Sequence, residues 1–136
     1  MTVVEAIKKW LNVNNVSVKE IEIDMLPAGI NTLALMKSPT NQVEEYIDGS
    51  QKRTEYYTLY IRKESQFNDE RIDNNACFED LENKVMEWNL DGNLPQLDGK
   101  RYCDNISISG TTYLFQSQEN ESIYSLTFEI IYRKEA

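Results

Sequence analysis

The sequence contains no histidine and only two cysteines, Cys77 and Cys103. Without histidine, the chain lacks the commonest general base and the commonest nitrogen ligand for metals. A Ser-His-Asp or Cys-His catalytic arrangement is therefore excluded within it. Two cysteines are too few for a disulfide framework and have no metal-type spacing. We expect both to be small buried groups, because reactive thiolates need cationic neighbours.

Long apolar runs and basic clusters are also missing. No segment reaches the roughly 18 apolar residues that a membrane-spanning helix needs. The first ten residues lack the features of a signal peptide, so we expect a cytoplasmic protein. The net charge of −9, from 23 acidic and 14 basic residues, argues against a general DNA-binding surface.

Motifs that carry chemistry are absent as well. The sequence has no G-x-x-x-x-G-K-[ST], G-x-G-x-x-G, C-x-x-C or H-E-x-x-H pattern. With so many carboxylates, the approach of two of them has little diagnostic value for acid–base catalysis. We therefore expect a protein that is not an enzyme, with no catalytic, cofactor-binding or metal-binding residues.

The length of 136 residues suits a single domain over residues 1–136. Residues 2–12 are predicted to form an amphipathic helix, because Thr2 and Glu5 have capping-box spacing. Its apolar face holds Val3, Ala6, Ile7 and Trp10.

Alternating apolar residues predict several strands. The first covers residues 18–25, where Glu20, Glu22 and Asp24 share one face. Three carboxylates in a row are compatible with a metal site. A solvated strand face is the favoured interpretation, because no second set of ligands converges on them.

A second strand is predicted over residues 32–36, followed by a loop at 37–41. Residues 43–47 and 54–61 are expected to form a hairpin through Asp48-Gly49, since glycine accepts the positive φ of such turns. The second arm carries bulky groups on both faces. That pattern suits a strand that is covered on both sides or that meets another subunit.

A long helix is predicted over residues 69–90, with Asn68 or Asp69 as N-cap and Gly92 as the C-terminal stop. The connector that follows holds two leucines that we expect to anchor it to the core. The inward face of the helix is expected to hold Ile72, Ala76, Cys77, Phe78, Leu81, Val85 and Trp88.

Residues 104–134 are predicted to form two long strands folded back on each other, with a solvent-exposed turn at 117–122. The last strand places five large groups on one face: Tyr124, Leu126, Phe128, Ile130 and Tyr132. The first strand changes apolar parity on either side of Gly110, which predicts a bulge or bend there. We expect this pair both to nucleate the core and to help line a subunit interface.

These elements predict an α+β fold: a single domain with a mainly antiparallel β-sheet, an N-terminal helix and one long central helix packed on one face. The eight tyrosines fall mostly in or beside strands. Tyrosine is enriched at interfaces, although core packing accounts for about half of those here.

The segments GNLPQLDGK, NISISGTTYLF and SIYSLTFEIIYRKE resemble the C-terminal half of the minor capsid or tail terminator proteins of tailed phages. These proteins occur in phages and prophages of Gram-positive bacteria. In the family pattern glycine directly precedes Tyr-Leu-Phe, whereas two threonines intervene here. The matching positions are Trp88, Leu94, Pro95, Leu97, Ile106, Tyr113, Leu114, Phe115, Tyr124 and Tyr132.

The resemblance implies a virion structural protein, assembled in the host cytoplasm, that forms a homo-oligomeric ring, typically a hexamer, on the head-proximal end of the tail tube. Such a ring stops tube polymerisation and joins the tail to the head connector. Its partners are the tail tube protein and a head-completion or connector protein, with no membrane.

DNA is expected to pass through the lumen without specific binding, repelled by acidic side chains. The loops at 38–41, 65–69 and 118–121 are candidates for contacts with the tube or connector. Two alternatives remain open. One is another head–tail connector or tail-completion subunit; the other is a small α+β domain that binds a ligand between sheet and long helix.

Overall fold

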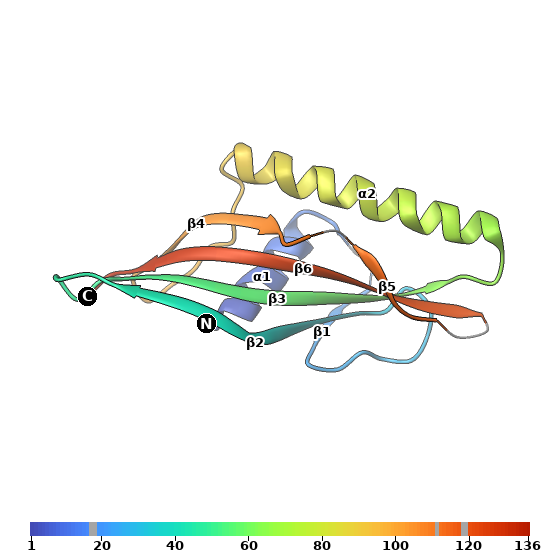
Figure 1. The fold of residues 1–136 in the computed structure, drawn as a ribbon, viewed down its shortest axis with the longest axis horizontal. Helices are drawn as coiled ribbons and strands as arrows, with labels where there is room; N and C mark the ends of the chain where they lie inside the picture. Colours follow the sequence, from blue (N-terminus) through green and yellow to red (C-terminus); the bar gives the residue numbers. More distant parts are fainter. Residues whose placement is uncertain (17–18, 111, 118–119) are drawn as a thin grey trace.

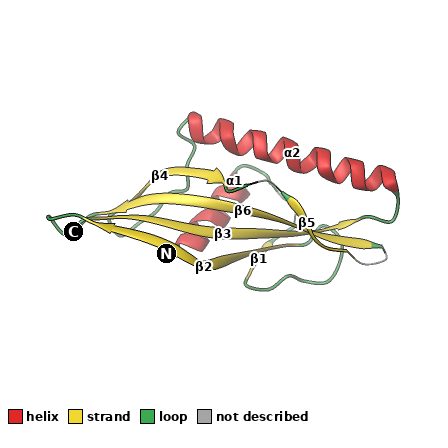
Figure 2. Ribbon diagram, viewed as in Figure 1, coloured by secondary structure: helices red, strands yellow, loops and turns green. Residues whose placement is uncertain are grey.

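The computed structural model describes residues 1–16, 19–110, 112–117 and 120–136. Two helices and six strands follow one another along the chain (Figures 1 and 2). They are α1 (Val3–Val13), β1 (Ile21–Ile23), β2 (Leu33–Glu45), β3 (Gln51–Glu64), α2 (Asn68–Leu90), β4 (Arg101–Ile108), β5 (Tyr113–Ser117) and β6 (Glu121–Lys134).

All six strands belong to one sheet in the order β1-β2-β3-β6-β4, and β5 also pairs with β6. Every pairing is antiparallel except that of β1 with β2, which is parallel. β4 and β5 lie one after the other along the same edge of β6, so each borders a different part of that strand. The predicted fold class, α+β with a mainly antiparallel sheet and an N-terminal helix, is confirmed.

Both helices pack against the same face of the sheet, here called the helix-covered face. The Trp10 ring of α1 meets Phe128 edge-on at 6.1 Å between centroids. The Phe78 ring of α2 lies 4.6 Å from Tyr124, which has the same strand parity as Phe128. Trp10 also meets Trp88 of α2 at 5.4 Å, so one ring joins the two helices and the sheet.

The N-terminal helix forms as its sequence predicts. The Glu5 backbone N–H donates to the Thr2 hydroxyl at 3.2 Å, which satisfies one of the free donors at the helix start. The predicted apolar face is buried, and Leu11 joins it. The first predicted strand is shorter than expected: it covers only Ile21–Ile23, and its proposed beginning at Val18 lies outside the described residues.

The prediction of a loop at residues 37–41 is wrong, because these residues belong to β2. The strand runs without interruption from Leu33 to Glu45, and its register against β3 shifts between Lys37 and Asn41. Pro39 cannot donate to a strand ladder and is tolerated at a bulge. A bulge in a continuous strand therefore replaces the loop.

The predicted turn between β2 and β3 is confirmed. Gly49 has φ +89°, and its N–H donates to the Tyr46 carbonyl. The Asp48 carboxylate accepts from the Ser50 backbone N–H at 2.9 Å. The turn and the end of β2, residues 43–50, are called the hairpin tip below; they form one end of the elongated molecule (Figure 1).

α2 departs from the prediction in two ways. Its N-cap is Phe67, whose backbone N–H donates to the Glu70 carboxylate at 3.0 Å, and not Asn68 or Asp69. Ile72, Ala76 and Cys77, predicted to face inward, are exposed. At 3.6 residues per turn Cys77 lies to the side of the buried stripe, whereas Ile72 and Ala76 lie on the opposite side of the helix. The helix touches the sheet along only a narrow line. The buried residues of α2 are Asn74, Phe78 and Val85.

The C-terminal segment forms three strands where two were predicted, because the first predicted strand is divided into β4 and β5. All five large groups predicted for the inner face of β6 are buried. A bend at Gly110, with φ +82°, separates β4 from β5. Ile106 pairs with Ile130 on the helix-covered face, whereas Tyr113 pairs with Ser125 on the other face. Apolar groups therefore lie on both faces, as the parity change predicted; the tip of the following turn, residues 118–119, lies outside the described residues.

Candidate functional site

A cleft of about 350 Å³ lies between α2, the end of α1 and the sheet. It exists because α2 touches the sheet along a narrow stripe, and it is here called the α2 cleft. Its floor is apolar and is formed by Leu33, Ile61, Phe78, Leu81 and Trp88. The volume lies in the range of small-molecule sites, and also suits a few side chains of a protein partner.

Polar groups line the rest of the α2 cleft. Lys63 and Lys84 bring positive charge, and the Lys84 ammonium also bonds to the Asp80 carboxylate at 3.0 Å. Asn14 contributes an amide from the end of α1, and its own side chain accepts from the Asn93 amide at 2.7 Å. Cys77 also lines the cleft and is exposed there. The cleft thus offers an apolar floor with a hydrogen-bonding, partly cationic wall.

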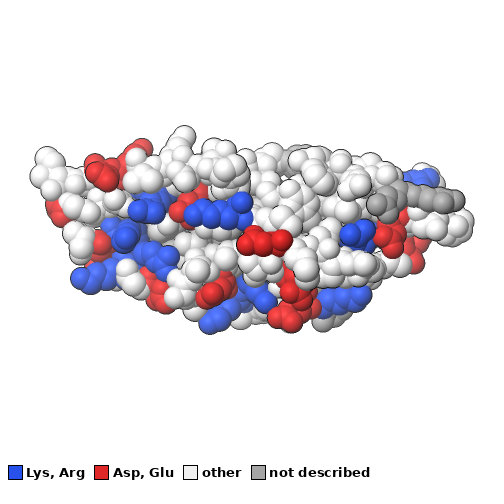
Figure 3. Space-filling model, turned by 90° about the horizontal axis from the view of Figure 1, so that it is seen from below, with Lys and Arg blue, Asp and Glu red and all other residues white. Residues whose placement is uncertain are grey.

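The surface of the molecule carries mixed charge. Seen from the side of β1 and β2, Lys and Arg side chains lie next to Asp and Glu, with an uncharged area towards the middle (Figure 3). Within the described part of this side, no broad area carries a single sign. None of the described helices is long and apolar enough to cross a membrane.

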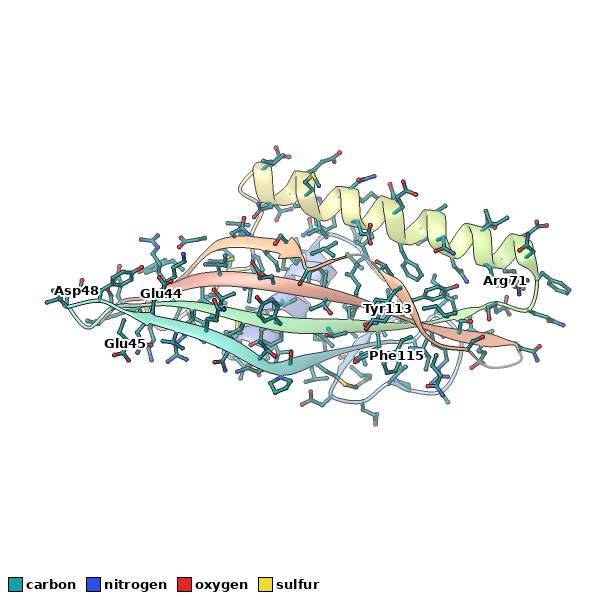
Figure 4. All side chains as sticks on the ribbon, in the orientation of Figure 1. Glu44, Glu45, Asp48, Arg71, Tyr113 and Phe115 are labelled. Atoms are coloured by element: carbon teal, nitrogen blue, oxygen red, sulfur yellow. The ribbon has the colours of Figure 1, made fainter. Side chains whose placement is uncertain are left out.

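The hairpin tip combines exposed apolar and acidic side chains. Ile47 is fully exposed at the turn, and Val43 and Tyr46 are about half exposed. Glu44, Glu45 and Asp48 surround them (Figure 4). Exposed apolar groups of this size on a turn mark a surface that another molecule covers.

The face of the sheet opposite the helices, here called the open face, carries a second apolar surface. Tyr113 and Phe115 of β5 are 56% and 53% exposed and lie on this face, whereas Leu114 between them is 52% exposed and pairs with Tyr124, which has the parity of the helix-covered face. The Phe115 ring meets Tyr60 of β3 at 5.2 Å, which places it on the open face (Figure 4). The Glu129 carboxylate on the same face accepts a hydrogen bond from Tyr56 and so raises the pKa of that phenol.

A buried carboxylate, Glu55, forms a third feature. Its two oxygens accept from the Tyr57 hydroxyl at 2.8 Å and the Tyr132 hydroxyl at 3.0 Å. Lys37 approaches to 3.9 Å but is half exposed. Burial, reinforced by Glu55, raises the pKa of both tyrosines. We did not anticipate this cluster, although Glu55 continues the alternation of Tyr57, Leu59 and Ile61 and so sits at a core position.

The residues of the phage-family pattern divide between core and surface. Pro95, Tyr124 and Tyr132 are buried, and Trp88, Leu94 and Leu97 pack partly buried against the core, so the predicted anchoring by both leucines is confirmed. The exposed members are Tyr113, Leu114 and Phe115. These three residues therefore lie on the outer surface, and Trp88 in addition lines the α2 cleft.

The thiols and the row of carboxylates near β1 do not assemble a site. Burial raises the pKa of Cys103 to about 11. The expected burial of Cys77 is wrong, because that residue faces the α2 cleft. Glu20 bonds to Lys8 at 3.0 Å, and within the described ranges no three acidic or cysteine residues group in a way that would hold a metal ion.

No protein-family model matches the chain, and no curated protein does.

Proposed function

We propose that this chain is a ring-forming structural protein of a tailed-phage particle, of the tail terminator kind. In this role copies of the chain close a ring on the head-proximal end of the tail tube, stop its growth and join it to the head connector. The resemblance of residues 88–132 to minor capsid and tail terminator proteins supports the proposal. A connector or tail-completion subunit of similar build is the nearest alternative.

The observation that carries the proposal is the exposed strand β5. Its three consecutive apolar residues, Tyr113 to Phe115, lie on a short strand for which β6 is the one pairing partner among the described residues. A sheet edge with exposed apolar side chains pairs readily with another chain. Its exposure is explained if it meets a further copy or a neighbouring virion protein.

The charge of α2 fits the passage of DNA through a ring. The helix contains seven acidic residues and only Arg71 and Lys84 as basic ones. Most of its surface is exposed, because only three of its residues are buried. An acidic wall facing the lumen would repel DNA and let it pass without binding.

Tails assembled with and without the protein test this function. Electron microscopy is expected to show abnormally long tubes without the protein and tubes of uniform length with it. Tubes of unchanged length, with heads that fail to join, would favour the connector role. Absence of the protein from purified particles would refute both.

The α2 cleft supports a second candidate function, a small ligand-binding domain. The apolar floor and the convergence of Asn14, Lys63 and Lys84 are typical of a site for a small amphipathic molecule. Trp88 lines the cleft, so its fluorescence is expected to change when such a ligand binds. A screen of amphipathic anions with this readout tests the candidate, and Trp88→Phe is the control.

A further inference from the structure

We propose that the hairpin tip of one copy inserts into the α2 cleft of a second copy, and that this contact builds the ring. The inference rests on the proposed ring-forming function and names the two surfaces that join. The geometry points to it through three observations: matching apolar surfaces, complementary charge, and the distance between tip and cleft within one chain.

The apolar match involves the most exposed large aliphatic side chain of the described residues. Ile47 has no contact that shields it from water in the single chain. The floor of the α2 cleft offers Leu33, Ile61 and Trp88 to such a group. Burying one isoleucine removes enough apolar surface from water to tighten association by about tenfold to a hundredfold.

The tip is acidic, whereas the cleft carries two lysines and one carboxylate, Asp80, which bonds to Lys84 at 3.0 Å. Glu44, Glu45 and Asp48 flank the apolar residues of the tip (Figure 4). Lys63 and Lys84 line the cleft. Opposite charges across an interface steer the encounter and fix its register.

The tip cannot reach the cleft of its own chain. Ile61 on the cleft floor and Gln51 at the base of the tip belong to the same strand, β3, ten residues apart. At about 3.3 Å per residue they are separated by about 33 Å. β3 is paired along this length with both β2 and β6, so it does not fold back.

The contact is therefore heterologous: two different surfaces meet, and each copy offers one of each. Contacts of this type propagate and close into a ring if the rotation allows it. An isologous dimer, in which the same surface meets itself, would stop at two copies. A head-to-tail contact of this kind is what a ring-forming subunit requires.

The native thiol in the cleft makes a direct test available. In an Ile47→Cys, Cys103→Ser variant, oxidation with diamide is expected to join the new thiol to Cys77 of the next copy. The product is a ladder of covalent oligomers longer than a dimer on a denaturing gel. Adding Cys77→Ser is expected to abolish the ladder. Leu90→Cys in the same background is the control, because Leu90 is also exposed but lies outside the cleft.

A second measurement does not depend on disulfides. Ile47→Glu is expected to weaken association about tenfold to a hundredfold in sedimentation equilibrium, with an unchanged circular dichroism spectrum. Leu90→Glu is expected to leave association unchanged. Natural-sequence oligomers that persist in Ile47→Glu, or crosslinks that persist after Cys77→Ser, would overturn the tip-in-cleft contact but not the proposed function. A natural chain that stays monomeric both alone and on tail tubes would overturn both.

Discussion

Glu55 gives the sharpest prediction for stability. Its carboxylate is the acceptor of two buried hydroxyls, those of Tyr57 and Tyr132. In Glu55→Ala both hydroxyls lose their acceptor inside the protein. Each unsatisfied group costs about 1–3 kcal/mol, so the free energy of unfolding is expected to fall by about 2–6 kcal/mol. That is a large share of the roughly 5–15 kcal/mol of a typical domain.

Of the three partners of Glu55, Lys37 is expected to contribute least to the free energy of unfolding. Lys37 is half exposed and 3.9 Å from Glu55, so solvent screens the pair. Its contribution is expected to be about 0–1 kcal/mol, and Lys37→Ala is the matched control. The triple variant Glu55→Leu, Tyr57→Phe, Tyr132→Phe is expected to recover most of the loss, because no polar group is then left without a partner.

Urea unfolding, followed by tryptophan fluorescence at one fixed protein concentration, measures these differences. Trp10 and Trp88 report on the junction of both helices. Both variants remove the ion pair, so a loss in Glu55→Ala no larger than that in Lys37→Ala would refute the argument from unsatisfied hydroxyls.

Three further predictions concern titration, thiol reactivity and the backbone. Because burial raises the pKa of Tyr57 and Tyr132, the folded state keeps both protonated where the unfolded state ionises. Their contribution to the free energy of unfolding is complete below about pH 10. As the pH rises above this value, the free energy of unfolding should fall by up to about 1.4 kcal/mol per pH unit for each tyrosine. Urea unfolding at a series of pH values measures this fall, and an equal pH slope in the variant with both tyrosines replaced by phenylalanine would contradict it. Cys103, with a pKa of about 11, should react with maleimide at neutral pH about a hundredfold more slowly than an unperturbed thiol. The exposed Cys77 should react first. Mass spectrometry distinguishes the two labelled sites, and faster labelling of Cys103 would contradict its burial. Gly110→Ala should cost about 1–2 kcal/mol, because its φ of +82° strains an L-residue while its surroundings have room for a methyl group; a urea midpoint equal to that of the natural sequence would show that the bend relaxes.

The sequence was most informative where side chains alternate or repeat along one element. The burial of β6 and of α1 could be read from period and capping alone, because both elements meet the core along their whole length. The continuity of β2 could not be predicted from the sequence, because Pro39 is typical of a loop. Pairing with β3 keeps the strand extended on both sides of Pro39.

The candidate surfaces were harder to predict from the sequence than the core. The prediction placed Ile72, Ala76 and Cys77 inside, although at 3.6 residues per turn Ile72 and Ala76 lie opposite Phe78 and Val85 and Cys77 lies to their side. The sheet therefore covers only a narrow stripe of the helix. The α2 cleft follows from that narrow contact, and so was foreseen only as an alternative. The exposed character of Phe115 was foreseeable, because the parity change at Gly110 left it no place on the inner face.

The length of strand β3 would also determine the spacing of subunits in the proposed ring. If the tip of each copy lies in the cleft of the next, the distance between neighbouring clefts equals the distance from tip to cleft within one chain. The length of β3 then determines the circumference of the ring. Insertions between Tyr57 and the tip would have to come in even numbers on each strand to keep the tip residues on their present faces. Each inserted pair would lengthen the circumference by about 7 Å per subunit.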